Sequence, residues 1–311
     1  MSKSYSSSDT LSLVAKVREA SQLLALSIAS SHDVSSIFDD IKEYEDVLKK
    51  YDAPPLASSR VLELGYGPRP MRLLALSSLG VDVFGVDRDR PHLNGGIGSV
   101  LATIRENGIE RGLKNAVRSL ISDPRHYKSL DQALECRGAR LKVERRRMLV
   151  RDLTEVGSLD GICPGLFDVA FSEDVMEHVP EAGLPILMRN LQQSLKPGGL
   201  ALLRPNVFTG ITGGHLVEWY PNAVDESGDK RSEPWEHLRK RRFSPNTFLN
   251  ELPRRAYREL FSDFFDVLEE RVDQPNLGRR LLTPTVKAEL SGYDDEELFS
   301  NRILWVLRKR T

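Results

Sequence analysis

The sequence predicts an α/β fold, a doubly wound and mainly parallel sheet of seven strands with helices on both faces. From Arg60 onward, short apolar runs alternate with segments of helical periodicity, and a parallel sheet requires this alternation. The expected strands cover residues 61–64, 81–86, 147–150, 167–171, 200–203, 264–270 and 303–307. The expected helices between them cover about 70–79, 91–105, 181–195 and 245–261.

Four segments fall outside the alternation. Residues 9–50 show helical periodicity and are followed by Pro54 and Pro55, so we expect an N-terminal helical cap over residues 1–55. A single domain over 56–311 then carries insertions near 106–140, 205–243 and 274–300.

The composition excludes several classes of protein. Two cysteines in 311 residues, Cys136 and Cys163, are too few for a disulfide framework and lack metal-ligand spacing. No apolar run reaches the roughly 18 residues of a membrane span, and the N-terminus lacks the pattern of a secretory signal. We therefore expect a cytoplasmic protein without a membrane span.

The charge is balanced, with 44 Lys and Arg residues against 45 Asp and Glu residues. No overall field favours nucleic acid as a partner. The arginine-rich stretches 137–151 and 239–242 could bind phosphates, but such runs more often form a solvated face, so a nucleic-acid acceptor is not favoured.

A glycine loop follows the first expected strand in the segment VLELGYGPRP, residues 61–70. Gly65 and Gly67 allow a tight turn and a close approach of the main chain to a ligand. A strand, a glycine turn and a helix N-terminus together suit a phosphate or a carboxylate. Two spaced glycines are also compatible with a turn that binds nothing.

Acidic residues at the next two strand ends favour a nucleoside ligand. Asp87 follows Gly67 by 20 residues, the interval at which an acid can accept hydrogen bonds from both ribose hydroxyls. Asp152 ends the third strand, where an adenine amino group would need an acceptor.

The residues around the loop decide between cofactors. A pyrophosphate favours a third glycine, which Pro68 and Arg69 replace here, and Glu63 would repel it. A ligand with an ammonium group and a sulfonium cation would be attracted by Glu63. The loop therefore favours S-adenosylmethionine over a nicotinamide cofactor.

These motifs together resemble the class I, Rossmann-like S-adenosylmethionine-dependent methyltransferases. The resemblance covers roughly residues 58–206 and includes FDVAFSEDVMEHVP and LKPGGLALLRPN in the family's order. It implies roles for seven residues: Glu63, Gly65 and Gly67 at the methionine end, Asp87 at the ribose, Asp152 and Leu153 at the adenine, and Ser172 facing the methyl group.

Two segments are candidates for acceptor binding. The stretch SEDVMEHV places Glu173, Glu177 and His178 at the end of the fourth strand. Some quinone O-methyltransferases hold a divalent ion with such acids and a Glu-His pair, so Mg²⁺ is an alternative here, although the structural role of that pair is favoured and we predict no metal.

The second segment is TGGHLVEWYP, residues 212–221, in which His215 has a near-neutral intrinsic pKa. Trp219 and Tyr220 add flat apolar surfaces with polar tips. The predicted reaction is O-methylation of a small molecule or sugar, with His215 as the leading base and Glu173 or Glu177 with His178 as the alternative centre. Residues 233–245, with Trp235 and His237, are a candidate lid.

Two other functions remain open. A nicotinamide-dependent oxidoreductase shares the strand, loop and ribose acid, and a non-catalytic adenosine-binding partner protein would need no acceptor residues. A homodimer is as compatible with the sequence as a monomer.

Overall fold

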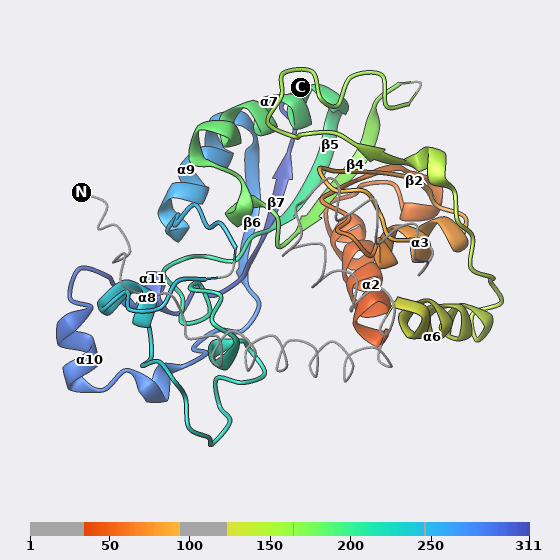
Figure 1. The fold of residues 1–311 in the computed structure, drawn as a ribbon. Coiled ribbons are helices and arrows are strands. Elements are labelled where there is room, and N and C mark those ends of the chain that lie inside the picture. The colour runs from red at the N-terminus through yellow and green to blue at the C-terminus, as the bar shows by residue number, and fades with distance from the viewer. Residues whose placement is uncertain (1–33, 94–122, 164, 246) are drawn as a thin grey trace. The chain divides into compact units, whose positions relative to one another are not determined.

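The computed structural model describes residues 34–93, 123–163, 165–245 and 247–311 (Figure 1). All seven expected strands are present: β1 (Arg60–Leu64), β2 (Asp82–Asp87), β3 (Met148–Val150), β4 (Phe167–Glu173), β5 (Leu195–Arg204), β6 (Asp266–Val272) and β7 (Ile303–Arg308). They form one sheet in the order β3-β2-β1-β4-β5-β7-β6. β1, β2 and β3 pair in parallel, whereas β7 runs antiparallel to β5 and β6, which confirms the predicted mainly parallel sheet.

The helices match the prediction less closely. Those in the described ranges are α2 (Ser35–Lys50), α3 (Met71–Ser78), α6 (Asp123–Glu135), α7 (Leu184–Ser194), α8 (Glu236–Arg239), α9 (Arg254–Phe264), α10 (Pro284–Glu289) and α11 (Asp295–Leu298). The helix expected from residue 245 starts only at Arg254, because Pro253 restricts the residue before it and cannot donate an N–H. Most of the expected helix over 91–105 and the first part of the expected cap, up to residue 33, lie outside the described residues.

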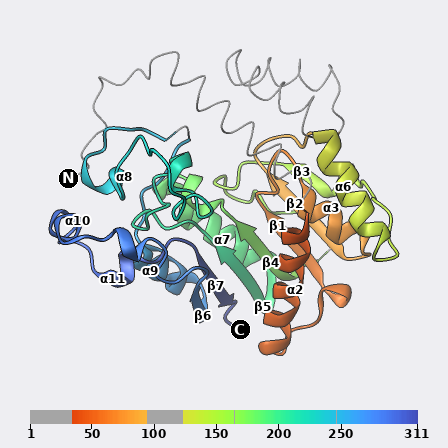
Figure 2. The same ribbon diagram turned by 90° about the horizontal axis from the view of Figure 1, so that it is seen from below.

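The chain divides into two compact units. We call the described residues within 34–153 and 160–170 the N-terminal unit, and those within 154–159 and 171–311 the C-terminal unit. In the N-terminal unit, the helices α2 and α6 both pack on α3 (Figure 2). The apolar residues Val61, Leu62 and Leu64 of β1 are completely buried there, as the continuous apolar run predicts for a central strand.

The C-terminal unit contains a second apolar core that the two late insertions build together. Its buried members come from residues 211–235 and 286–299: Ile211, Leu216, Trp219, Val224, Trp235, Val286, Leu290, Leu298 and Phe299. Accordingly, α8, α10 and α11 lie near one another (Figure 1). The insertions near 205–243 and 274–300 therefore fold as one body, not as separate loops.

A carboxylate of this body caps helix α9. Glu297 accepts hydrogen bonds from the backbone N–H groups of Arg254 and Arg255, at 2.8 and 3.0 Å, and from the hydroxyl of Thr209 at 2.8 Å. These N–H groups have no partner within the helix, and a negative charge is favourable at this end. The cap fixes α9 to the insertions.

Within the described ranges, every helix falls short of the length or apolarity that crossing a membrane would require.

Candidate functional site

The glycine loop of the N-terminal unit follows β1 directly. Gly65 and Gly67 have φ angles of 74° and 69°, a left-handed conformation that glycine adopts without strain. The N–H of Gly65 donates to the carbonyl of Val86 at 2.7 Å, and the N–H of Gly67 donates to Asp87 Oδ2 at 2.8 Å. A Cβ on Gly67 would meet no atom of the described residues within 4 Å, so the loop leaves room beside its backbone.

Asp87, at the end of β2, organises this loop. Besides Gly67, it accepts the N–H of Asp89 at 2.8 Å through Oδ1. Partial burial raises the pKa of Asp87, while the N–H groups of Asp89 and Gly67 oppose that shift. Because an ionised carboxylate offers about four acceptor positions, Asp87 retains capacity for further hydrogen bonds.

Glu63 is a buried acid beside the loop, with 2% of its surface exposed. Arg72 Nη1 donates to Glu63 Oε1 at 3.2 Å, whereas Oε2 has no hydrogen-bond partner among the described residues. Burial raises the pKa of Glu63 to about 7, against the charge and hydrogen bond of Arg72. An incompletely paired buried carboxylate fits a cationic ligand group.

Tyr66, which the sequence analysis missed, supports the neighbouring loops. Its hydroxyl lies 3.3 Å from the carbonyl of Asp89 and 3.2 Å from that of Leu149. A Cβ on Gly85 would come within 2.7 Å of the Tyr66 ring, so β2 needs glycine there. No sequence signal marks Tyr66, because its partners lie 23 and 83 residues away.

Asp152 and Leu153 follow β3 in the same unit. Asp152 is half-buried, and its Oδ2 lies 4.0 Å from Nε of the exposed Arg88. Leu153 is buried, with 7% of its surface exposed. The N–H of Arg151 donates to the carbonyl of Asp87 at 2.9 Å, which joins the ends of β2 and β3.

In the C-terminal unit, the end of β4 carries Ser172 and Glu173, both buried. Arg302 Nη2 donates to Glu173 Oε2 at 2.7 Å, and Arg204 Nε lies 3.6 Å from the same oxygen. Two guanidinium groups therefore stabilise the ionised form of Glu173. That pairing weakens Glu173 as a proton acceptor.

Glu177 follows in the turn after β4 and is also buried, with 3% exposed. The backbone and side-chain N–H groups of Asn206 donate to its Oε1, at 3.3 and 2.9 Å. Burial raises the pKa of Glu177 to about 8, and the nearby Asp174 adds to the shift. Glu177 is thus a mostly neutral acid at pH 7.

Three histidines gather in the C-terminal unit. His178 and His215 contact each other edge to face, with ring centroids 5.2 Å apart. His178 Nδ1 lies 2.9 Å from the carbonyl of Phe248, and His237 Nε2 lies 2.8 Å from that of Phe208. Since a carbonyl only accepts, each of these nitrogens carries a proton, and the orientations of both rings are fixed.

His215 differs from its neighbours. Its backbone is left-handed, with φ at 50°, and its half-buried ring has no hydrogen-bond partner among the described residues. Burial, together with the nearby His178 and His237, lowers the pKa of His215 to about 4. At neutral pH its imidazole is therefore uncharged, and its lone pair meets no hydrogen-bond donor in the described part of the chain.

The glycine before His215 allows the His237 ring to pack close to the backbone. A Cβ on Gly214 would lie 2.6 Å from Cγ of His237, so His237 packs directly against the backbone next to His215. His237 is buried and is therefore part of the core, which corrects its assignment to a lid.

Two tryptophans also differ from expectation. Trp219 is buried, and its Nε1 donates to the hydroxyl of Ser232 at 2.8 Å, so it offers no surface to an acceptor. Trp235 is completely buried and is no lid residue either. Both belong to the core of the insertions, whose apolar partners come from distant parts of the chain.

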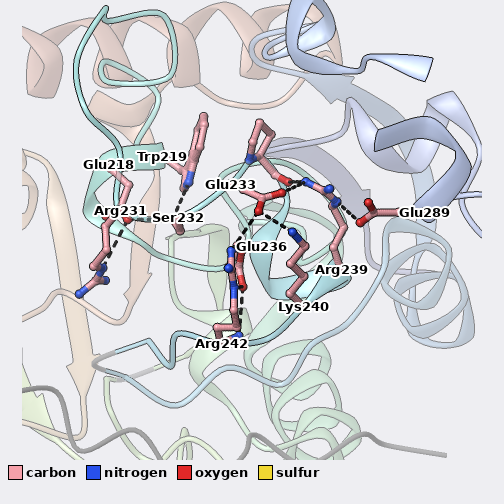
Figure 3. Close-up of polar contacts among 11 residues, drawn as sticks. Glu218, Trp219, Arg231, Ser232, Glu233, Glu236, Arg239, Lys240, Arg242 and Glu289 are labelled. Carbon is pink, nitrogen blue, oxygen red and sulfur yellow. Dashed lines mark hydrogen bonds and ion pairs between the residues drawn. The ribbon is translucent and has the colours of Figure 1, made fainter. Parts of the chain in front are cut away.

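The arginine-rich segment 239–242 is paired internally (Figure 3). Arg239 pairs with Glu233 and Glu289, and Lys240 pairs with Glu233. Arg242 donates to both oxygens of Glu236, at 2.9 and 2.7 Å, while Arg241 pairs with Glu251 at 2.8 Å. These carboxylates neutralise the segment, which argues against phosphate binding there.

Across the parts of the chain that the structure describes, no cluster of three or more His, Cys, Asp or Glu side chains has the arrangement of a metal site.

The chain has a doubly wound α/β fold of the kind that binds cofactors with a nucleoside part. The sheet order indicates this fold, as does the glycine loop that Asp87 bonds. Residues 38–269 match the family described as "Methyltransferase domain", which covers most of the chain. The chain belongs to this family, the class I S-adenosylmethionine-dependent methyltransferases, and its cofactor is S-adenosylmethionine.

Solved structures with similar folds are distant in sequence. A methyltransferase from Methanosarcina mazei shares 15% identity over 85% of this chain and 97% of its own, with a TM-score of 0.43. A putative methyltransferase from Listeria monocytogenes shares 15% identity over 86% and 97%, also at 0.43. The N-methyltransferase NodS from Bradyrhizobium japonicum, solved with S-adenosylhomocysteine, shares 11% identity over 87% of each chain, at 0.36. A search of curated proteins finds no match.

Proposed function

We propose that this enzyme methylates a hydroxyl group of a small molecule or sugar, with His215 as the general base. The observation that carries the proposal is the state of the His215 ring, which is neutral, half-buried and unpaired among the described side chains. His178 and His237 each donate one ring N–H to a backbone carbonyl, which fixes both rings, whereas no such bond orients the His215 ring within the described chain.

A base with a low pKa suits methyl transfer to oxygen. As the hydroxyl oxygen attacks the methyl carbon, the carbon–sulfur bond breaks and positive charge develops on that oxygen. Its proton then becomes strongly acidic, so His215 can accept it late in the step despite a pKa of about 4. Alignment of the oxygen with the methyl axis provides most of the remaining acceleration.

The cofactor supplies the electrophilic methyl group when it is bound. In our proposal Glu63 attracts its cationic amino-acid end, the backbone of Gly65 and Gly67 surrounds that end, and Asp87 accepts from the ribose hydroxyls. Two features support these roles: Glu63 Oε2 has no hydrogen-bond partner, and a Cβ on Gly67 would meet no atom within 4 Å, both counted over the described residues.

Three further residues complete the proposed cofactor contacts. Asp152 would accept from the adenine amino group, and Leu153 would pack on the ring. Ser172 would face the methyl group. The half-buried state of Asp152 and the buried state of Leu153 are compatible with these roles.

Metal-assisted transfer has less support in the chemistry of the side chains. Glu177 retains its proton near pH 7 and is held by Asn206, while Glu173 is paired with Arg302. A divalent cation prefers ionised and available carboxylates, so it would have to displace both sets of partners.

We further propose a cytoplasmic location and leave a homodimer as a hypothesis. Cys136 and Cys163 are both free thiols, which suits a reducing compartment.

The test is a screen of hydroxylated small molecules and sugars with S-adenosylmethionine, in which product formation is followed as a mass gain of one methylene. Once an acceptor is found, we expect His215→Ala to lower kcat by roughly 10²- to 10⁴-fold, the usual contribution of a general base. Binding of S-adenosylhomocysteine should be unchanged, and EDTA should have no effect. Full activity of His215→Ala would refute the assignment of the base.

A further inference from the structure

Three charged side chains of the N-terminal unit form a compact group that we call the Asp40–Arg72–Glu63 triad. They come from three elements, α2, α3 and β1, and α2 packs on α3 (Figure 2). Arg72 Nη2 donates to Asp40 Oδ2 at 2.7 Å, and Nη1 donates to Glu63 Oε1 at 3.2 Å. One guanidinium thus serves two carboxylates.

The sharing is unequal. The bond to Asp40 is 0.5 Å shorter than the bond to Glu63 (3.2 − 2.7 Å), although Glu63 is the more deeply buried acid. Only one oxygen of Glu63 is bonded within the described chain. A buried carboxylate is ionised only when nearby positive charge and hydrogen-bond donors stabilise its charge. Because Arg72 bonds more closely to Asp40, it stabilises the ionised form of Glu63 only in part.

We propose that Arg72 is a positioning residue for the cofactor, which sets the ionisation of Glu63, and that Asp40 on α2 tunes this effect by drawing Arg72 away. The inference rests on the proposed role of Glu63 at the cationic end of the cofactor. It assigns α2, a helix that precedes the glycine loop, a part in cofactor affinity.

The charged groups that face Glu63 are few. Arg72 on α3 favours its ionised form, whereas Asp87 on β2 and Asp40 on α2 oppose it. Together with burial, they bring the pKa of Glu63 to about 7. Below that pH, a ligand whose ammonium group needs the carboxylate must drive off a proton as it binds.

The experiment is calorimetric titration with S-adenosylhomocysteine, which carries the same amino-acid end, between pH 5.5 and 7.5. Two buffers of different ionisation enthalpy give the number of protons released. At pH 6, we expect the wild-type protein to release close to one proton on binding. Below the midpoint of the profile of affinity against pH, the affinity should rise roughly tenfold for each unit of increasing pH. Glu63→Gln should release none.

Substitutions of Arg72 and Asp40 should shift the pH midpoint of the binding affinity in opposite directions. Arg72→Met keeps the aliphatic stem but removes the charge, so the midpoint should move to higher pH and affinity at pH 7 should fall. Asp40→Asn frees Arg72 for Glu63, so the midpoint should move to lower pH and affinity at pH 6.5 should rise. Arg72→Lys, which retains the charge, should restore most of the wild-type midpoint.

A matched control comes from the other end of β1. Arg60 pairs with Asp82 at 3.0 Å in the same unit, so Arg60→Met removes a more exposed ion pair of the same strand and leaves the contacts of Glu63 in place. Its midpoint should equal that of the wild type.

The failure of this inference is distinct from the failure of the proposed function. If the wild-type protein does not bind S-adenosylhomocysteine at any pH, the proposed cofactor contacts are wrong. If it binds but Asp40→Asn leaves the midpoint in place, or shifts it upward, Arg72 does not set the ionisation of Glu63. Asp40→Asn keeps this test decisive even if Arg72→Met does not fold.

Discussion

Strand β1, beside the glycine loop, and residues 233–242 each contain a buried glutamate, and the pKa values of the two acids are shifted in opposite directions. Glu63 and Glu236 are 2% and 0% exposed. Burial raises the pKa of Glu63 to about 7. Burial acts on Glu236 in the same direction, but the side-chain and backbone hydrogen bonds of Arg242 outweigh it and lower its pKa.

The difference lies in the partners. Glu236 receives two side-chain N–H groups and one backbone N–H from Arg242, so both of its oxygens are bonded. Glu63 receives one N–H from an arginine that also serves Asp40. A carboxylate with both oxygens hydrogen-bonded stabilises the fold, whereas a carboxylate with only one bonded oxygen can still accept a hydrogen bond from a ligand.

Removing the saturated pair should have the largest effect on stability. Arg242→Met would leave Glu236 buried without its guanidinium partner, and we expect the free energy of unfolding to fall by about 3 kcal/mol. Chemical denaturation monitored by circular dichroism measures this change.

Lys240→Met is the matched control, because its pair with Glu233 is about 40% exposed on both sides. We expect the free energy of unfolding to change far less there, because solvent screens the exposed pair. Equal losses of unfolding free energy in the two variants would show that the hydrogen bonds between Arg242 and Glu236 are not what stabilises this segment.

Glu177 gives a smaller effect that depends on pH. Its pKa of about 8 lies above the usual value for a glutamate, so the folded protein keeps a proton that the unfolded chain has lost. Stability from this group is present at low pH and is lost as pH rises toward 8. Between pH 7 and 8, we expect the titration of Glu177 alone to lower the free energy of unfolding by about 1 kcal/mol.

Glu177→Gln keeps an acceptor for Asn206 but does not titrate, so its stability should change less over the same interval. His215 and His237 do not obscure this comparison, because their pKa values of about 4 place their titration well below pH 7. Parallel pH profiles for the two proteins would contradict a raised pKa for Glu177.

The sequence predicts the strands and the loop because these depend on local patterns. Apolar runs identify all seven strands, and the interval of 20 residues identifies Asp87, which the structure bonds directly to Gly67. The same patterns do not reveal Arg72, Asn206 or Tyr66, whose roles arise from contacts across 9 to 83 residues.

The predictions about acceptor binding depended on residue type and not on a local pattern. By residue type alone, Trp219 was proposed for an acceptor surface, and Trp235 and His237 for a lid, yet all three are buried. Their burial follows from the joint folding of two insertions that lie far apart in the chain. Periodicity within either insertion carries no information about the other.

The most direct test of the account is the affinity of the whole chain for S-adenosylhomocysteine, measured by calorimetry for the wild-type protein and Asp87→Ala. We predict one binding site in the wild-type protein. In the variant, the affinity should be lower by about tenfold or more, since hydrogen bonds to a charged group contribute roughly 1.5–3 kcal/mol. Absence of binding to the wild-type protein, or equal affinity in Asp87→Ala, would contradict the account.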